Sequence, residues 1–251
     1  MIAFRLSLIL CFICSIIFSC SKEDSGSQGT RLKMIRSQDG DSVGYVFFKY
    51  DGQGRLNMMI DSGNNGYISK TYIAYDPDGR LSKVTNEGTI YTFELDNKGK
   101  IIKRFVRYPA SQTTAVEDVY SYDINGRIIV DSIFSYWSGN LFETITYSYD
   151  QNNNITQSEV VDKVYSMLLG RYQYFYDNHP NPLNSAGLSI YMLNSGEEIA
   201  LLGRNNLLTI KDSYGNPVNY TYEYNSDGFP KKRSLQDNGD PQVVYADYYY
   251  E

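Results

Sequence analysis

Few side chains in this sequence are of the types that usually carry out chemistry. His179 is the only histidine among the 251 residues, and no Gly-x-Ser-x-Gly segment offers a serine nucleophile. We interpret His179 as a loop residue, because Pro180 and Pro182 next to it disfavour a regular strand. The chain has three cysteines, Cys11, Cys14 and Cys20. So few histidines and cysteines do not make a usual zinc site, and we expect neither a metal nor a cofactor.

Carboxylates are the one reactive group that the sequence supplies in number. A glycosidase needs only two of them, so a carboxylate-based hydrolase acting on glycans stays open as an alternative. Residues 76–79 and 237–240 hold close acidic pairs, but neither follows the spacing of an EF-hand loop. Most aspartates have another explanation, because they occupy the first position of a repeated turn. The sequence therefore favours a non-enzymatic protein.

The first nineteen residues have the pattern of a secretory signal. Arg5 is the only charge before Lys22, and residues 6–18 are almost entirely apolar. The segment Ile17-Phe18-Ser19-Cys20 resembles the lipobox of bacterial lipoproteins, in which the cysteine is acylated and becomes the first mature residue. We expect 1–19 to be removed and Cys20 to be the lipid attachment site.

The residues after Cys20 predict a flexible tether and a location. Positions 21–29 are small, polar or charged, and 20–30 is therefore read as a lipidated cysteine with a tether. Lys22-Glu23-Asp24 is similar to the surface-export signal of Bacteroidota lipoproteins. The resemblance implies a protein anchored in the outer membrane and facing the cell exterior, with the periplasmic face still open.

A repeated segment fills the rest of the chain. Tyr50-Asp51-Gly52-Gln53-Gly54-Arg55-Leu56 recurs, with small changes, at residues 75–81, 95–101, 122–128, 149–155 and 224–229, and in broken form at Tyr176-Asp177. Aspartate is typical of the first position of a type I turn, and glycine suits the fourth, where φ must be positive. We predict structural turns with these residues in those roles: Asp51, Gly54, Asp76, Gly79, Asp123 and Gly126.

The flanks of each turn predict strands. Aromatic or apolar residues stand two apart before each turn, as in Phe48/Tyr50 and Tyr147/Tyr149, so each pair lies on one face of a strand. We expect most tyrosines to line the core, and the basic residue after each glycine to pack over a neighbouring ring. A second set of turns lies between the repeats. About sixteen strands fit in residues 31–251, as an antiparallel up-and-down meander that curls or closes into a barrel-like sheet.

One stretch departs from the repeat. Residues 184–205 are rich in leucine, and Ser195-Gly196-Glu197-Glu198 has the pattern of a helical capping box. We predict an insertion with a short helix at about 184–205, within a single all-β domain.

The repeats are similar to the YD repeats of Rhs-type proteins. With the lipobox, Tyr176-Asp177-Asn178-His179-Pro180-Asn181-Pro182 and the segment 205–224, the chain also resembles an uncharacterised family of Bacteroidota lipoproteins with a porin-like β fold. The resemblance implies a fold and a location but no activity. Asn154, where the repeat has a basic residue, is the clearest departure.

The remaining expectations concern partners. The formal net charge of −6 gives no electrostatic reason to bind nucleic acid. Tyr136 and Trp137 stand beside a hairpin turn and away from the tyrosine stripe, so they are the candidate ligand contacts, with a packed edge position as the alternative. We expect a surface binding or scaffold module whose partner is a glycan, a peptide or another lipoprotein, and whose membrane contact is the lipid. An integral pore is disfavoured, because it would need an apolar outer band.

Overall fold

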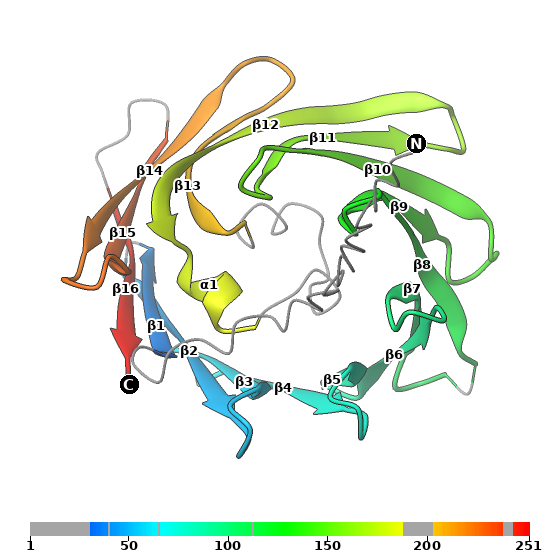
Figure 1. Cartoon of the computed structure of the whole chain (residues 1–251), viewed down its shortest axis with the longest axis horizontal. Helices are drawn as coiled ribbons and strands as arrows, with labels where there is room; N and C mark the ends of the chain where they lie inside the picture. Colours follow the sequence, from blue (N-terminus) through cyan, green and yellow to red (C-terminus); the bar gives the residue numbers. More distant parts are fainter. Residues whose placement is uncertain (1–30, 40, 65, 112, 188–202, 238–242) are drawn as a thin grey trace, which may run out of the picture.

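The computed structural model describes residues 31–39, 41–64, 66–111, 113–187, 203–237 and 243–251. Sixteen antiparallel strands follow one another around a closed barrel, and β1 pairs with β16 to complete the ring. Figure 1 shows this ring of strands around the short helix α1. The predicted all-β meander is confirmed, and the structure shows that the sheet closes.

The strands are mostly seven to nine residues long. Their bounds are β1 Leu32–Asp39, β2 Ser42–Tyr50, β3 Leu56–Gly63, β4 Ile68–Tyr75, β5 Leu81–Asn86, β6 Thr89–Leu95, β7 Ile101–Arg107, β8 Ala115–Tyr122, β9 Ile128–Phe134, β10 Leu141–Tyr149, β11 Ile155–Asp162, β12 Met167–Pro180, β13 Asn205–Lys211, β14 Pro217–Tyr224, β15 Pro230–Asp237 and β16 Val243–Tyr250.

The period-two pattern of the sequence places the apolar and aromatic residues on the inner face. Phe48, Ile73, Tyr120, Tyr147 and Tyr174 are all buried there, each two residues before the tyrosine that begins its repeat. Burial of these large side chains away from water stabilises the barrel.

The two ends of the barrel carry different connections. All repeat turns lie at one end, which we call the repeat end, because each follows an even-numbered strand. The described chain also begins there, since Arg31 and Glu251 exchange backbone hydrogen bonds of 3.1 and 2.9 Å. The connections that follow odd-numbered strands lie at the opposite end, which we call the distal end.

The predicted insertion begins with a single helical turn. Helix α1, Pro182–Ser185, starts after Asn181, whose side-chain oxygen accepts a hydrogen bond from the Leu183 N–H at 3.0 Å. Residues 188–202, including the capping-box pattern, lie outside the described residues. None of the helices in the described ranges is long and apolar enough to cross a membrane.

The structure corrects one local interpretation. His179 and Pro180 belong to the end of β12 and not to a loop, although the register of β12 on β13 shifts between Tyr176 and Pro180. The shift lets a proline stand in the strand without breaking a regular ladder. The ring of His179 stacks on Tyr224 with the centroids 3.9 Å apart.

Candidate functional site

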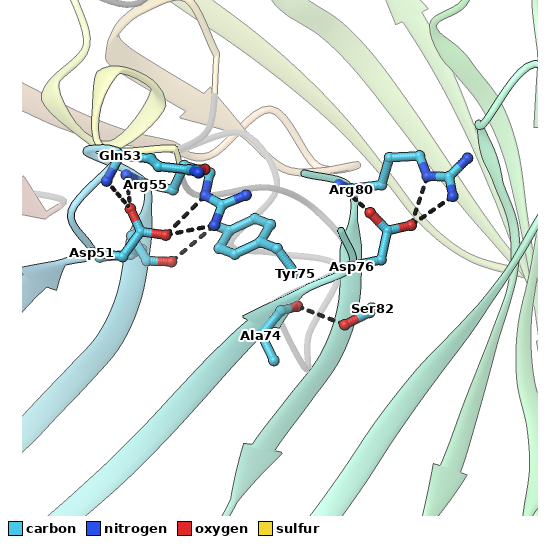
Figure 2. A network of polar contacts seen from close by, with 9 residues as sticks. Asp51, Gln53, Arg55, Ala74, Tyr75, Asp76, Arg80 and Ser82 are labelled. Atoms are coloured by element: carbon cyan, nitrogen blue, oxygen red, sulfur yellow. Dashed lines mark hydrogen bonds and ion pairs between the residues drawn. The ribbon is translucent and has the colours of Figure 1, made fainter. Parts of the chain in front are cut away.

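The repeat turns are built by the aspartate at their first position. In the first repeat, Asp51 Oδ1 accepts hydrogen bonds from the backbone N–H groups of Gln53 and Arg55, both at 2.9 Å. The other oxygen, Oδ2, binds the Arg55 guanidinium at 2.7–2.8 Å. Figure 2 shows the same arrangement at Asp76 and Arg80 in the next repeat. Backbone and guanidinium donors likewise hold the pKa of Asp123 below its usual range.

Glycine stands where these turns need a positive φ. The φ angles of Gly54, Gly79 and Gly126 are 80°, 83° and 85°, and Asn153 takes the same region at 66° in the fifth turn. The space above the glycine is also occupied. A Cβ on Gly126 would lie 2.8 Å from Nζ of Lys100, which belongs to the preceding repeat.

Several neighbouring repeats are bound to each other through a basic residue of one repeat and the tyrosine of the next; Leu95 and Asn154 interrupt this pattern. The Arg55 guanidinium lies 4.4 Å from the centroid of the Tyr75 ring (Figure 2), and Arg127 lies 4.8 Å from that of Tyr149. The tyrosine hydroxyl then donates to a backbone carbonyl of the preceding repeat, as Tyr149 does to Ile128 at 2.6 Å. The same bond is made by Tyr50, Tyr75, Tyr122, Tyr176 and Tyr250. In the last repeat Tyr222 donates to the Leu207 carbonyl, while the repeat tyrosine, Tyr224, donates to the Asp177 carboxylate.

The sequence pattern did not indicate why tyrosine is used. The strand register shifts beside five of these tyrosines, as between Ser148 and Tyr149, where the chain leaves the strand through a bulge; the five are Tyr50, Tyr75, Tyr122, Tyr149 and Tyr176. The hydroxyl satisfies a carbonyl close to that irregularity. The aspartates, glycines and tyrosines of the repeat end are therefore occupied by the fold.

The acidic pair of the second repeat has the same structural role. Arg80 binds both Asp76 and Asp78, at 2.6 and 2.8 Å. Within the described ranges, no group of three or more His, Cys, Asp or Glu residues is placed to hold a metal ion. Of the second acidic segment, 238–240 lies outside those ranges.

Asn154 explains the departure of the fifth repeat. Its amide donates to Asp150 at 2.9 Å, as an arginine would, and also to Asn205 at 3.0 Å. Its oxygen accepts the backbone N–H of Asn205 at 3.0 Å. An asparagine therefore joins the turn to the start of β13, where the insertion returns to the sheet.

The two predicted ligand contacts lie at the distal end, in the connection between β9 and β10. Trp137 is 91% exposed, and its ring meets Tyr136 edge-on at 5.1 Å. Tyr136 is held in turn by Tyr108, at 4.8 Å, and by a 2.5 Å hydrogen bond from its hydroxyl to Ser111. The indole is therefore supported on one edge while most of its surface faces water. It is not a packed edge residue.

Other distal connections also present exposed aromatic rings. Tyr67 precedes β4, Tyr165 joins β11 to β12, and Tyr214 joins β13 to β14. We call Tyr67, Tyr108, Trp137, Tyr165 and Tyr214 the distal rim. Sequence reasoning found only Trp137, because the other four could not be told from the many tyrosines of the strands.

A cavity of about 270 Å³ opens on the inner face near the distal rim. It is lined from β10, β11 and β12 by Glu143, Ile145, Ser158, Val160, Leu169, Gly170, Tyr172 and Tyr174. Burial, with the nearby Asp162, raises the pKa of Glu143. The hydroxyls of Ser158 and Tyr174 are 2.7 Å apart. The cavity thus combines two rings, a hydroxyl pair and one carboxylate.

A charged cluster is buried in the neighbouring wall. Arg104 Nε lies 2.5 Å from Asp118 and 2.9 Å from Glu117. Asp131, on the next strand, is 6% exposed, and burial together with Asp118 raises its pKa to about 8. Three carboxylates around one guanidinium leave an excess of negative charge, which a proton on Asp131 reduces. Asp118 and Asp131 do not line the cavity.

A second hollow, of about 740 Å³, lies at the repeat end between the turns that follow β8 and β10. Its polar residues are those of the turns, since Arg127 binds Asp123 and Asp150 accepts bonds from Asn152 and Asn154. We therefore assign it to the structural ladder.

Comparison with solved structures agrees with the barrel architecture. A porin-like protein from Bacteroides uniformis superposes with a TM-score of 0.61 at 16% sequence identity, covering 88% of this chain and 98% of its own. A porin-like protein from Bacteroides vulgatus gives 0.54 at 13%, covering 88% and 99%. At these identities the likeness shows the fold alone. No protein-family model and no curated protein matches the sequence.

Structures that contain TcdB2 and TccC3 match over a short part of their length. The structure of TcdB2-TccC3-Cdc42 covers 84% of this chain and 11% of its own, at 13% identity and a TM-score of 0.34. A TM-score of that size does not indicate a shared fold.

Proposed function

We propose that this protein is a lipid-anchored, non-enzymatic binding module of the cell envelope. In this account Cys20 carries the lipid, the barrel stands outside the bilayer, and the distal rim contacts a partner. The observation that carries the proposal is the exposure of aromatic rings on the distal connections: Trp137, Tyr165 and Tyr214 are 91%, 78% and 90% exposed. Rings that the fold does not bury are typical of recognition surfaces.

The outer face of the barrel supports a position outside the membrane. Oppositely charged residues face each other across neighbouring strands, such as Lys103 and Glu94 at 2.9 Å or Arg171 and Glu159 at 2.6 Å. Arg36 and Asp247 form a third such pair at 3.2 Å. A lipid-facing barrel needs an apolar band around its outer face. Charged side chains within such a band would cost free energy, because they would face lipid and not water.

The connectivity supports the orientation. The tether of residues 20–30 meets the barrel at Arg31, which lies at the repeat end. A lipid on Cys20 would therefore hold the repeat end toward the outer membrane. The distal rim would then point away from the bilayer, and at the cell exterior if the protein is exported.

The anchor is tested by Cys20→Ala in the native host. We expect the variant to leave the membrane fraction, while alkaline carbonate keeps the wild type bound through its lipid. Mass spectrometry should find acyl chains on Cys20 as the first residue. A variant that stays in the membrane after carbonate treatment, with residues 1–19 shown by mass spectrometry to be removed, would indicate a barrel embedded in the bilayer.

The binding role is tested by Trp137→Ala, with Ile124→Ser as the matched control. Ile124 is fully exposed at a repeat-end turn, so it controls for the loss of an exposed apolar side chain. We expect Trp137→Ala to lose its partner in a cell-surface pull-down and on a glycan array, and Ile124→Ser to keep it. Equal binding by both variants would contradict a recognition role for the distal rim.

A glycan hydrolase remains the second candidate, and one observation favours it: Glu143 faces the cavity with a raised pKa, as a general acid would. The partner carboxylate that a glycosidase needs is not found among the described residues that line this cavity. Release of reducing sugar from a bound glycan, lost in Glu143→Gln, would establish the hydrolase over the binding module.

A further inference from the structure

The cavity on the inner face and the distal rim share the same strands. Trp137 lies in the connection that leads into β10, six positions before Glu143. Tyr165 lies in the connection that joins β11 to β12, the strands that form the other two walls of the cavity. The connections that carry Trp137 and Tyr165 therefore lead directly into the strands that line the cavity.

The shape of the cavity depends on a glycine. Gly170 has an ordinary backbone conformation, but a Cβ there would lie 2.9 Å from the Tyr172 ring. The missing side chain lets that ring lie close against the strand beside the cavity. Tyr174, two positions further on the same face, provides the second ring. Aromatic faces of this kind pack against the C–H faces of sugars.

The polar groups of the cavity fit hydroxyl groups. Glu143 is partly buried, and within the described part of the chain its carboxylate has no hydrogen-bond or ion-pair partner, so it can accept from a ligand. The paired hydroxyls of Ser158 and Tyr174 can each donate or accept. Among the described residues that line the cavity none is basic, which disfavours an acidic ligand.

The size of the cavity limits the ligand. A volume of about 270 Å³ corresponds to roughly nine water molecules at about 30 Å³ each, which is room for one sugar ring. Any further units of the ligand would have to leave toward the distal rim, where Trp137 and Tyr165 stand exposed. A small amine could pair with the Glu143 carboxylate, but it would not contact the exposed rings of the distal rim.

We propose that the cavity binds the terminal residue of a neutral glycan, with Glu143, Ser158 and Tyr174 bonding its hydroxyls and Tyr172 packing on its ring, while Trp137 stacks on the next residue. This inference rests on the proposed binding role of the distal rim. It adds the ligand class and a second, inner contact set.

The single tryptophan of the chain gives a direct readout of the rim. Full-length protein in detergent is titrated with neutral oligosaccharides selected on an array, and Trp137 fluorescence reports occupancy. Glu143→Gln should weaken binding by about tenfold or more at unchanged melting temperature, as the loss of a hydrogen bond to a ligand does. Tyr174→Phe should weaken binding to a similar extent, with a lower melting temperature because buried Ser158 loses its partner. A free neutral monosaccharide should compete with the oligosaccharide, because it takes the cavity.

The outcomes separate this inference from the proposed function. Binding lost in Trp137→Ala but unchanged in both cavity variants would overturn the cavity site and leave the rim intact. A protein captured by the rim, with no neutral glycan bound on the array, would overturn the glycan and keep the binding module. Binding restricted to acidic or amino sugars would also overturn the proposal. Ile124→Ser should bind like the wild type in every case.

Discussion

The same turn occurs at both ends of the barrel, with different consequences. Asp212 accepts bonds from the N–H groups of Tyr214 and Asn216, and Gly215 has a φ of 82°, as in the repeat turns. At the third position the repeat-end turns carry polar or charged residues, namely Gln53, Asp78, Lys98, Asn125, Asn152 and Asp227, whereas the distal turn carries Tyr214. The turn backbone therefore does not require an aromatic residue there. The repeat end uses its rings for stability, and the distal end leaves them exposed.

The largest difference between the ends is expected from glycine replacement. Gly126→Val should lower the free energy of unfolding by about 1–3 kcal/mol, because a positive φ is strained for valine and the flexible Lys100 side chain must shift from its place over the Tyr122 ring. Gly215→Val should cost only the strain, about 1–2 kcal/mol, since nothing lies within 4 Å of its Cβ position. Urea unfolding of both variants measures the comparison. Equal losses of unfolding free energy in the two variants would show that the packing of Lys100 on the next repeat adds no stability.

The buried charges predict how stability depends on pH. Asp131 has a folded pKa of about 8, well above the unfolded value of about 3.9, so the folded protein binds a proton that the unfolded chain releases. Asp131 therefore contributes fully to the free energy of unfolding below about pH 4, and this contribution is lost as the pH rises to about 8. The free energy of unfolding falls over this range by up to about 1.4 kcal/mol per pH unit. The lowered pKa of Asp123 acts in the opposite sense and only at acid pH.

Asp131→Asn tests this assignment, because the amide mimics the protonated acid. Between pH 5 and 8 the variant should show a flatter melting-temperature profile than the wild type. A wild-type profile that rises toward pH 8 would contradict a buried, protonated Asp131.

A smaller effect is expected from the tyrosine hydroxyls. Tyr149→Phe removes the 2.6 Å bond to the Ile128 carbonyl and should cost about 1–2 kcal/mol, because that acceptor lies in the barrel wall. Tyr165→Phe, at the exposed distal rim, should change stability by less than about 0.5 kcal/mol. Thermal unfolding of the two variants measures the difference. A similar melting temperature for both would contradict a stabilising role of the Tyr149 hydroxyl.

Local turn chemistry made most of the fold predictable. Aspartate and glycine at fixed spacing mark the repeat turns, and the period-two aromatics mark the strand faces, so sixteen antiparallel strands follow from residues such as Tyr122, Asp123 and Gly126. Closure of the sheet could not be read in this way, because pairing of β1 with β16 joins residues at opposite ends of the chain.

The candidate site was predictable only in part. Trp137 stood out because its residue type is unique in the chain. The cavity did not, since Glu143, Ser158 and Tyr172 come from three strands and become neighbours only through the pairing register. The same holds for Asp131 and Arg104, whose burial depends on which face of each strand turns inward. Strand pairing over long sequence separations carries that information, and a single sequence does not show it.

The most direct test of a structural repeat end and a recognising distal end is one binding measurement on a combined variant. Trp137→Ser, Tyr165→Ser and Tyr214→Ser together remove three exposed rings and no contact of the repeat ladder. We predict a melting temperature within about 2 °C of the wild type and loss of all binding on the glycan array and at the cell surface. Retained binding at an unchanged melting temperature would contradict the account.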